Sequence, residues 1–509
     1  MALRILCKWV FMSNVFRRTK IIATLGPASE SPEVLEKLIR AGADVVRLNF
    51  SHGTADEHRA RAERVRDISR KLNRHVAILA DLQGPKIRVE KFKDDRKIHL
   101  QVGQKFDLDT AFPADQGDET QVGCSYEPLP RDVKPGDTLL LNDGLIVMQV
   151  DDVVGTRVKC TVTVAGVLSN RKGINKLGGG LSAPALTDKD KEDLKTAVSI
   201  GADYLAISFP RSREDMEEAR RMLDDLGSDM GLVAKVERAE AILEGTIEGI
   251  VEASDAIMVA RGDLGVEIGD ARLPHVQKHL IRLARTYNKV AITATQMMES
   301  MINNPVPTRA EVSDVANAVF DGTDAVMLSA ETASGDFPDL AVKAMAQVCV
   351  EAEKYPREKS KHRLHERFER IDETIALSTM YAANHLEVRA IGALTETGST
   401  PLWMSRISSG IPIYALTAHE KTCRRVTLFR GVYPISFNAV GIHDHAVLNR
   451  AIVQEFMDRG LVDPEDTVIL TKGDLMGTRG GTNAMKIASI PEVLEAAPGD
   501  WKSQCPALK

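Results

Sequence analysis

Eight short runs of apolar residues recur along the N-terminal part of the chain, each of a length typical of a buried strand. Most runs are separated by amphipathic segments with helical spacing, such as SPEVLEKLIRAG at 31–42. Strands that alternate with helices indicate βαβ units, and eight such units predict a closed (β/α)8 barrel with a parallel sheet. An aspartate accompanies the start of every second run. The runs begin at residues 19, 43, 75, 202, 231, 255, 290 and 325, and the aspartates are Asp44, Asp203, Asp255 and Asp324.

The pattern changes between the third and fourth runs, at residues 89–171. Apolar and polar residues alternate there, and turn signals such as Asn142-Asp143-Gly144 interrupt them. We therefore expect a small antiparallel β-barrel domain inserted into one βα loop, on the side where it can act as a lid that excludes water. Three consecutive glycines near its return to the barrel, Gly178 to Gly180, can supply hinge freedom.

A charged stretch after about residue 352 precedes a further α/β pattern. It reads as an exposed connector, followed by a helix near 374–386 and by strands near 388, 411 and 466. A chain of 509 residues is too long for one core, so several domains are expected. We expect a tail at 1–18, a catalytic barrel at 19–88 and 172–351, the lid domain at 89–171, and a C-terminal α/β domain at 352–509.

Composition narrows the class of protein. The net charge of −6 shows no basic excess, so no nucleic-acid partner is expected, and no apolar run is long enough to span a membrane. The six cysteines are scattered without CxxC spacing, which argues against a disulfide framework or a thiolate zinc site. These features indicate a globular protein of the reducing cytoplasm.

Polar side chains follow the C-terminal end of nearly every apolar run. In a (β/α)8 barrel the active site lies at that face, so we expect these side chains to share one site. Any single one could instead be a capping residue, and the recurrence favours the common site. The residues are Thr24, Arg47, Asn49, Ser51, Asp81, Ser208, Lys235, Glu237, Arg261, Asp263, Thr295, Gln296, Ser329 and Glu331.

An ammonium and a carboxylate interrupt the apolar strand GLVAKVERAE at 231–240. Residues two apart on a strand point to the same side, so Lys235 and Glu237 project together. Glu237 and Asp263, from consecutive strands, can converge on one Mg²⁺ or Mn²⁺ ion, leaving Lys235 to face an anionic ligand. A metal and a lysine around one anion suit phosphoryl transfer. The alternative is a buried Lys235–Glu237 ion pair, which gives little net stability.

Neighbouring residues offer further ligand groups. Backbone N–H groups of Gly262 and Asp263, where a strand turns into a helix, can hold a carboxylate. Arg47 can clamp a phosphate through paired hydrogen bonds. Asn49, Ser51 and Asp81 offer oxygens of the kind that a monovalent cation binds, although they could equally form a hydrogen-bonded layer of the barrel.

Seven segments together closely resemble pyruvate kinase, in the right order and over essentially the whole chain after Arg17. The overall pattern is similar to the bacterial form that responds to sugar monophosphates and AMP. The resemblance implies transfer of a phosphoryl group from phosphoenolpyruvate to ADP, giving pyruvate and ATP, by a cytoplasmic homotetramer. The segments are RRTKIIATLGPAS, VVRLNFSHG, DLQGPKIR, AKVERAEA, MVARGDLGVEIG, ATQMMESM and TRAEVSDVANAVFDGTDAVMLSAETA.

Site residues follow from the resemblance by motif. It implies catalytic roles for Lys235, Arg47 and Thr295, and Mg²⁺ ligation by Glu237 and Asp263. The substrate pocket would include Arg47, Lys235, Gly262, Asp263 and Thr295. The nucleotide side would include Asn49, Ser51, His52, Arg88 and Lys189, and a monovalent cation would contact Asn49, Ser51, Asp81 and Leu82.

Lys86, in GPKIR, departs from the pattern of many family members, which have Glu there and require K⁺. Its ammonium can supply the missing positive charge directly. We therefore expect activity without K⁺, although an exposed lysine of no consequence is the alternative, and the oxygen ligands of a weak K⁺ site remain.

The C-terminal domain resembles the family's regulatory domain. The loops TETGST and TKGDLMGTRGGTN can cradle a phosphate through backbone N–H groups and an arginine, so an effector site for a sugar monophosphate or AMP is expected. Other readings are a metal-dependent aldolase or lyase of pyruvate-like enolates, or an inactive sugar-phosphate sensor. The expected effector residues are Thr395, Thr397, Gly398, Ser399, Thr400 and Arg479.

Overall fold

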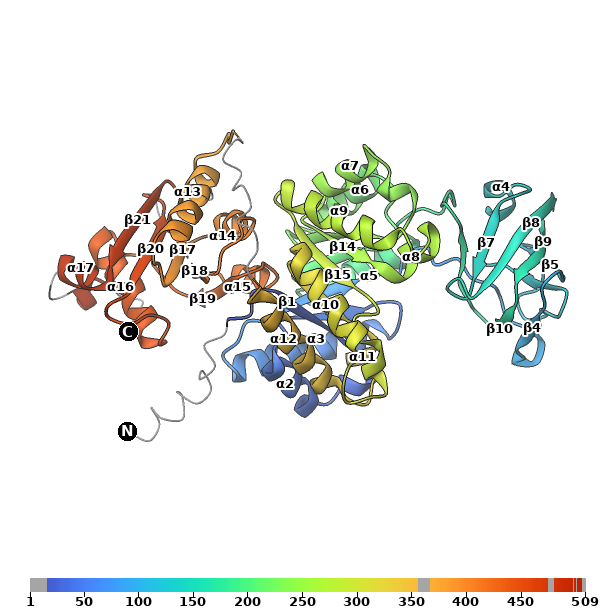
Figure 1. Cartoon of the computed structure of the whole chain (residues 1–509), viewed down its shortest axis with the longest axis horizontal. Helices are drawn as coiled ribbons and strands as arrows, with labels where there is room; N and C mark the ends of the chain where they lie inside the picture. Colours follow the sequence, from blue (N-terminus) through green and yellow to red (C-terminus); the bar gives the residue numbers. More distant parts are fainter. Residues whose placement is uncertain (1–15, 356–366, 475–479, 498, 500, 506–509) are drawn as a thin grey trace. The chain divides into compact units, whose positions relative to one another are not determined.

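The computed structural model describes residues 16–355, 367–474, 480–497, 499 and 501–505 (Figure 1). Eight strands close into a barrel in the order β1-β16-β15-β14-β13-β12-β3-β2, and every apolar run expected to be a barrel strand forms one. The (β/α)8 barrel is therefore confirmed. The strands are β1 (Lys20–Leu25), β2 (Val45–Asn49), β3 (Ala77–Asp81), β12 (Tyr204–Ile207), β13 (Gly231–Val236), β14 (Ala256–Ala260), β15 (Val290–Ala294) and β16 (Ala325–Leu328).

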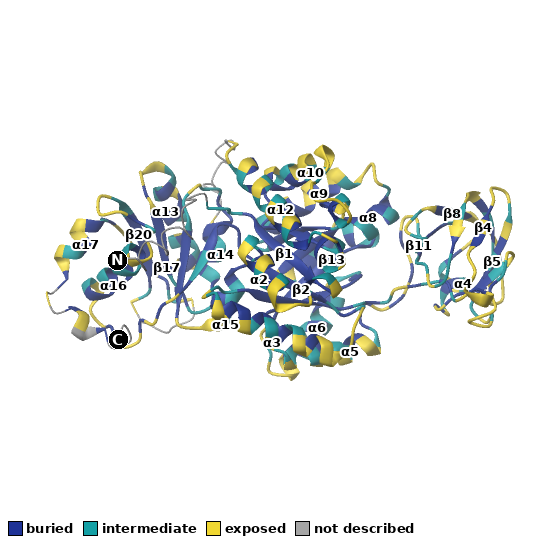
Figure 2. Ribbon diagram, turned by 90° about the horizontal axis from the view of Figure 1, so that it is seen from below, coloured by how far each residue is buried: buried dark blue, intermediate teal, exposed yellow. Residues whose placement is uncertain are grey.

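The strand interiors are buried almost completely because both faces are covered, as Figure 2 shows for the barrel strands. Three of the repeated aspartates fix the start of the strand before them in the barrel. Asp44 accepts the backbone N–H of Ile21, Asp203 that of Ile78, and Asp255 that of Leu232, at 2.7–2.9 Å. The sequence repeat thus has a physical basis in strand pairing.

Helices follow the strands and begin at recognisable caps. Ser31, Thr187 and Thr308 each accept a backbone N–H from the first turn of the helix that follows. The helices are α2 (Pro32–Ala41), α3 (Ala55–Lys71), α5 (Asp188–Ser199), α6 (Arg213–Asp225), α7 (Thr246–Glu252), α8 (Arg261–Ile268), α9 (Leu273–Thr286), α10 (Arg309–Asp321), α11 (Ala330–Ala333) and α12 (Pro338–Glu353), with short 3₁₀ turns η1 (Pro27–Ser29), η3 (Glu240–Ile242) and η4 (Glu299–Ile302).

The inserted β domain is confirmed as a curled half-barrel rather than a closed one. A six-stranded sheet of order β11-β7-β8-β9-β5-β6 accompanies the two-stranded sheet β10-β4. Asn142, Asp143 and Gly144, the predicted turn, all have positive φ, between β7 and β8. The sheet extends past residue 171, because β11 pairs with β7. The elements are η2 (Lys93–Asp95), β4 (Ile98–Leu100), β5 (Lys105–Asp109), β6 (Gln121–Gly123), α4 (Leu129–Asp132), β7 (Thr138–Leu141), β8 (Ile146–Val154), β9 (Arg157–Val164), β10 (Gly166–Leu168) and β11 (Ile174–Lys176).

The C-terminal α/β domain contains a five-stranded sheet of order β19-β18-β17-β20-β21, with β21 antiparallel to β20. Strands β17, β18 and β20 are those expected from sequence, whereas β19 and β21 were missed because Pro434 interrupts the first and exposed residues the second. The elements are α13 (Ile371–His385), β17 (Ala390–Leu394), α14 (Ser399–Ser405), β18 (Ile413–Thr417), α15 (Glu420–Val426), β19 (Val432–Ser436), α16 (His445–Asp458), β20 (Thr467–Lys472), β21 (Ala484–Ser489), α17 (Ile490–Ala496) and η5 (Trp501–Gln504).

The described residues divide into two compact units, and every strand-end residue from Arg47 to Gln296 belongs to the same one, made of 47–63 and 78–296. The cysteines that the structure describes are buried and free, so they form no disulfide. No helix among the described residues is long and apolar enough to span a membrane.

Candidate active site

Lys235 and Glu237 project together at the carboxyl end of β13, as the alternation of the strand predicts. Lys235 Nζ lies 2.9 Å from Glu237 Oε1 and donates to Ser208 Oγ at 2.7 Å. Ile207 of β12 is in register with Ala234, which places the next residues, Ser208 and Lys235, side by side. The side chain of Lys235 is 11% exposed, so its charge is held in a largely dry environment.

A second ion pair adjoins the first. Arg47 Nε lies 2.6 Å from Asp81 Oδ2, and Lys235 Nζ lies 3.3 Å from Asp81 Oδ1. Burial alone would raise the pKa of the Asp81 carboxyl, but Arg47 and Lys235 together hold it below its ordinary value. The structure therefore brings Arg47, Asp81, Lys235 and Glu237 into one charged cluster.

Glu237 is the strained member of this cluster. Burial, opposed by Lys235 and helped by the carboxylate of Asp263, raises the pKa of Glu237 to about 7. Two carboxylates that repel each other suit a hard divalent cation, which takes one or two carboxylates and completes its shell with substrate oxygens. The described residues contain no group of three or more His, Cys, Asp or Glu side chains that could hold a metal by themselves.

Phe209 is a site residue that sequence reasoning missed. Its backbone N–H donates to Glu237 Oε2 at 3.0 Å from a conformation with φ of 56°. A bulky side chain at positive φ is a strained arrangement that persists only when its surroundings enforce it. No sequence signal identifies such a residue. Ser208, before it, was signalled only as a polar residue at a strand end.

Thr295 and Gly262 meet at the ends of β14 and β15, whose last residues, Ala260 and Ala294, are paired. The Gly262 N–H, expected to be open to a substrate carboxylate, donates to Thr295 Oγ1 at 2.8 Å. Thr295 has a φ of 69°, and Arg261 holds its carbonyl oxygen with a hydrogen bond of 2.7 Å. The structure thus groups Gly262 and Thr295, with Asp263 in the first turn of α8.

The residues of the expected nucleotide side are brought together in part. Asn49 Oδ1 accepts the Ser51 N–H at 3.1 Å, and the Asn49 carbonyl accepts the His52 N–H at 3.2 Å. Lys189 Nζ reaches the same loop, donating to the Phe50 carbonyl at 2.9 Å. Arg88 lies instead on the outgoing linker to the inserted domain, where it forms a bridge with Gly173. Gly173 begins the return linker, residues 173–181, which includes the short strand β11.

Of the residues expected to bind a monovalent cation, Asn49, Asp81 and Leu82 have oxygens that already interact with other groups of the protein. Asn49 Oδ1 accepts the Ser51 N–H, and the Leu82 carbonyl accepts the Ser208 hydroxyl at 2.7 Å. Both Asp81 oxygens face cationic side chains. Lys86 is exposed and lines the same pocket as Asp263.

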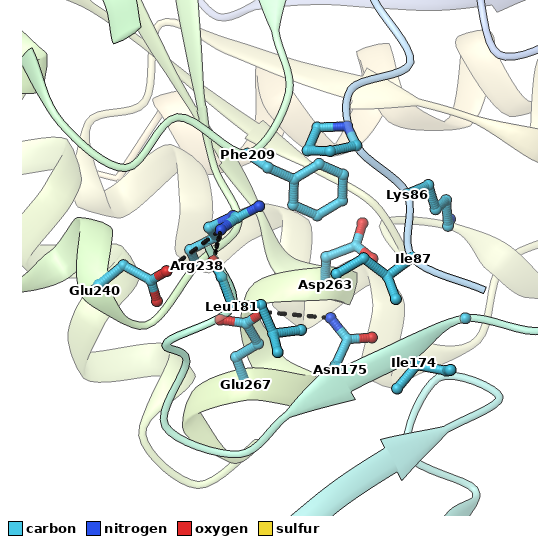
Figure 3. Close-up of a pocket in the computed structure, with 12 residues that line it drawn as sticks. Lys86, Ile87, Ile174, Asn175, Leu181, Phe209, Arg238, Glu240, Asp263 and Glu267 are labelled. Carbon is cyan, nitrogen blue, oxygen red and sulfur yellow. Dashed lines mark hydrogen bonds and ion pairs between the residues drawn. The ribbon is translucent and has the colours of Figure 1, made fainter. Parts of the chain in front are cut away.

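That pocket lies where both linkers of the inserted domain meet the barrel (Figure 3). It is bordered by the outgoing linker at Pro85 to Ile87 and by the return linker near Asn175 and Leu181. Asp263 points into it, and Phe209, whose N–H binds the carboxylate of Glu237, also lines it. The remaining lining residues are Gly173, Ile174, Arg238, Glu240 and Glu267.

The expected effector loop forms a compact turn between β17 and α14. Thr395 Oγ1 accepts the N–H of Gly398, which has a φ of 88°, and Thr400 Oγ1 lies 3.0 Å from the hydroxyl of Thr482. Thr482 belongs to the second loop, so the two loops meet. The hydroxyls of Thr397 and Ser399 lie 2.6 Å apart. Arg479 lies outside the described residues.

Known proteins resemble the chain in sequence and in structure. Residues 16–342 match the family model described as pyruvate kinase, barrel domain, and residues 373–488 match pyruvate kinase, alpha/beta domain. Pyruvate kinase II of Salmonella typhimurium is 56% identical over 94% of this chain and 100% of its own length. Pyruvate kinase of Haemophilus influenzae is 56% identical over 91% of this chain and 97% of its own.

A crystal structure of a pyruvate kinase from Cryptosporidium parvum superposes with a TM-score of 0.87 at 34% identity, covering 93% of this chain and 96% of that one. The likeness therefore extends over the barrel, the insertion and the C-terminal domain. The chain belongs to the pyruvate kinase family, and its activity is the family's divalent-metal-dependent transfer of a phosphoryl group from phosphoenolpyruvate to ADP in glycolysis.

Proposed function

We propose that Lys235 and Arg47 carry the chemistry of this reaction by surrounding the phosphoryl group with positive charge. The observation that supports this most is the burial of the Lys235 ammonium beside Glu237, with Arg47 on the far side of Asp81. Charge spreads over three phosphoryl oxygens in the transition state, and fixed cations in a dry site stabilise that charge without reorganising. Each such group can contribute about 3 kcal/mol.

Glu237 and Asp263 would hold the Mg²⁺ or Mn²⁺ ion, since their mutual repulsion favours a cation between them. When bound, the ion neutralises charge on the phosphoryl oxygens. The N–H of Phe209 and the ammonium of Lys235 each hold one oxygen of Glu237, which orients the carboxylate. Gly262, Asp263 and Thr295 would line the substrate pocket, with the Thr295 hydroxyl near the enolate.

Asn49, Ser51, His52, Arg88 and Lys189 would form the nucleotide side. The hydrogen bond from Lys189 to the Phe50 carbonyl supports a common surface for four of them. The inserted domain, joined to the barrel by linkers that line the pocket beside Asp263, would act as the lid that excludes water from the reaction.

A coupled assay with lactate dehydrogenase tests the metal assignment. Glu237→Gln keeps the size of the side chain but removes its charge, so the Mg²⁺ concentration for half-maximal rate should rise at least about tenfold. An unchanged Mg²⁺ requirement would contradict the role given to Glu237. Glu192→Ala, on the exposed surface of α5, serves as the control.

We also propose that the enzyme does not require K⁺, with Lys86 supplying the charge. The internal partners of Asn49, Asp81 and Leu82 favour this, because a monovalent ion would have to compete for their oxygens.

Regulation by a sugar monophosphate or AMP is proposed at the loops that meet through Thr400 and Thr482. We expect the enzyme to work as a cytoplasmic homotetramer. Substrate saturation curves with glucose 6-phosphate, ribose 5-phosphate and AMP test the effector site. If none of the three shifts the curve, the assignment fails.

A further inference from the structure

The return linker of the inserted domain contacts one buried glutamate of the barrel at two points. Glu267, on α8, is 5% exposed. Its carbonyl oxygen accepts the N–H of Gly178 at 2.9 Å, and its Oε1 lies 3.4 Å from Nδ2 of Asn175. Figure 3 shows the side chains of Glu267 and Asn175 joined by this contact at the pocket wall. One residue thus contacts the linker at two points, with both its backbone and its side chain.

The other oxygen of Glu267 reaches a different segment. Its Oε2 accepts the backbone N–H of Ala239 at 2.8 Å. Ala239 lies two residues after Glu237, and Glu267 lies one helical turn after Asp263 on α8. The carboxylate therefore ties the return linker to both segments that carry the proposed metal ligands.

Two neighbours extend the same attachment along the linker. Arg238 donates to the Leu181 carbonyl at 2.7 Å, and Glu240 Oε2 accepts the Gly180 N–H at 3.3 Å. Gly179 has a φ of 79°, a conformation that favours glycine, and its Cα passes close to the carboxylate of Glu240. Because the Ile174 N–H donates to the Ile87 carbonyl at 2.9 Å, fixing the return linker also restrains the outgoing one.

Stability does not account for an acid at this place. Burial raises the pKa of the Glu267 carboxyl to about 7 in spite of the hydrogen bond from Ala239. Burying an ionisable carboxyl has a net energetic cost, whereas an apolar side chain would avoid that cost but leave the Ala239 N–H without an acceptor. The buried carboxyl of Glu267 contacts the return linker and the segments that carry Glu237 and Asp263, although its burial costs free energy. This combination points to a role in the reaction.

We propose that Glu267 is a positioning residue, which couples the return linker of the lid to the segments bearing Glu237 and Asp263 so that the lid closes in alignment with them. The inference rests on the lid role proposed above. Glu267 itself touches neither substrate nor metal. It acts by holding Asn175, Gly178 and Ala239 in one cluster.

The test compares Glu267→Ala, Asn175→Ala and the double variant in the coupled assay. Glu267→Ala should lower kcat/KM for ADP about tenfold, the effect of one lost hydrogen bond to a charged group. The Kd for Mn²⁺, measured without substrate, should stay within about twofold, since the metal ligands themselves remain. Because both variants break the same contact, the double variant should be no worse than Glu267→Ala. Glu267→Gln, which keeps an acceptor for Ala239, should recover most of the loss.

Tryptic cleavage after Lys176 provides a readout that does not depend on activity. Cleavage in the presence of phosphoenolpyruvate and Mg²⁺ should be faster in Glu267→Ala than in the wild type. Three outcomes would overturn the proposal. The losses of kcat/KM in the two single variants could multiply in the double variant, or the affinity for Mn²⁺ could fall as much as kcat/KM. Glu267→Ala could also leave both the kinetics and the tryptic cleavage unchanged. If Glu267→Ala does not fold, Asn175→Ala must by itself lower kcat/KM for ADP, or the proposal fails. If trypsin cleaves the wild-type enzyme equally fast with and without substrates, that result would instead contradict the lid role.

Discussion

The backbone N–H of Phe209 holds Glu237 at 3.0 Å from a left-handed conformation that an aromatic residue rarely adopts. Such strain costs about 1–3 kcal/mol and persists where the surroundings enforce it. At this position it fixes one oxygen of the carboxylate, while Lys235 fixes the other. Glu237 is therefore oriented before any ligand arrives.

Two substitutions of Phe209 separate this strain from the loss of the ring. Phe209→Gly and Phe209→Ala both remove the ring, but only glycine accepts positive φ without penalty. Phe209→Gly should therefore be more stable than Phe209→Ala by about 1 kcal/mol. Chemical denaturation of the two variants measures the difference. Equal stability would show that the backbone at 209 is not strained.

Lys86 should determine the response to K⁺. The wild type should turn over in buffer free of Na⁺ and K⁺, because the ammonium takes the place of the ion. Lys86→Glu should lose activity in that buffer and recover it when K⁺ is added. Lys97→Glu, at another exposed lysine, makes the same change of charge away from the site. A large stimulation of the wild type by K⁺ would refute the proposal.

Glu267 should make stability depend on pH in a defined direction. Burial, with a smaller contribution from Glu240, raises its pKa from 4.5 to about 7 against the opposing effects of Ala239, Asn175 and Arg238. The folded state thus binds this proton more tightly than the unfolded state. The protonated carboxyl therefore contributes to the free energy of unfolding below pH 4.5, and this contribution is lost as the pH rises to about 7.

Relative to Glu267→Gln, the wild type should lose up to about 3 kcal/mol of unfolding free energy across that window. Denaturation of both proteins from pH 4.5 to pH 7.5, without divalent metal, measures the difference. A constant difference between the two would show that the carboxyl titrates normally.

Arg406 and Asp324 form an ion pair that is fully buried in both side chains. Arg406 Nη1 lies 2.9 Å from Asp324 Oδ2, and the Arg430 N–H contacts the other oxygen. Arg406→Met removes the partner and leaves a buried charge, which should cost about 3–5 kcal/mol of stability. Adding Asp324→Asn should recover much of that loss. If the double variant is as unstable as Arg406→Met, uncompensated charge is not the cause.

The barrel could be predicted from the sequence because its signals are local. Each strand is a continuous apolar run, and Lys235 and Glu237 stand out because charge interrupts such a run. The aspartate repeat also proved structural, through backbone N–H groups of neighbouring strands. In the C-terminal domain, β19 and β21 lack an apolar run of this kind and were missed.

Other parts of the site depend on contacts that no local pattern encodes. Glu267 looks like an ordinary helical acid until the fold places Asn175 and Ala239 against it. Phe209 reads as the end of an apolar run, and its positive φ arises only from the packing around it. The Gly262 N–H was expected to be open, but the fold gives it Thr295 as a partner.

The rate of pyruvate formation by Lys235→Met tests the central claim most directly. Methionine keeps the length of the side chain and removes its charge, and Glu192→Ala again provides the control. With phosphoenolpyruvate, ADP and Mg²⁺ in the coupled assay, the variant should be slower by about 100- to 1000-fold while remaining folded. A folded Lys235→Met enzyme with undiminished turnover would contradict the account.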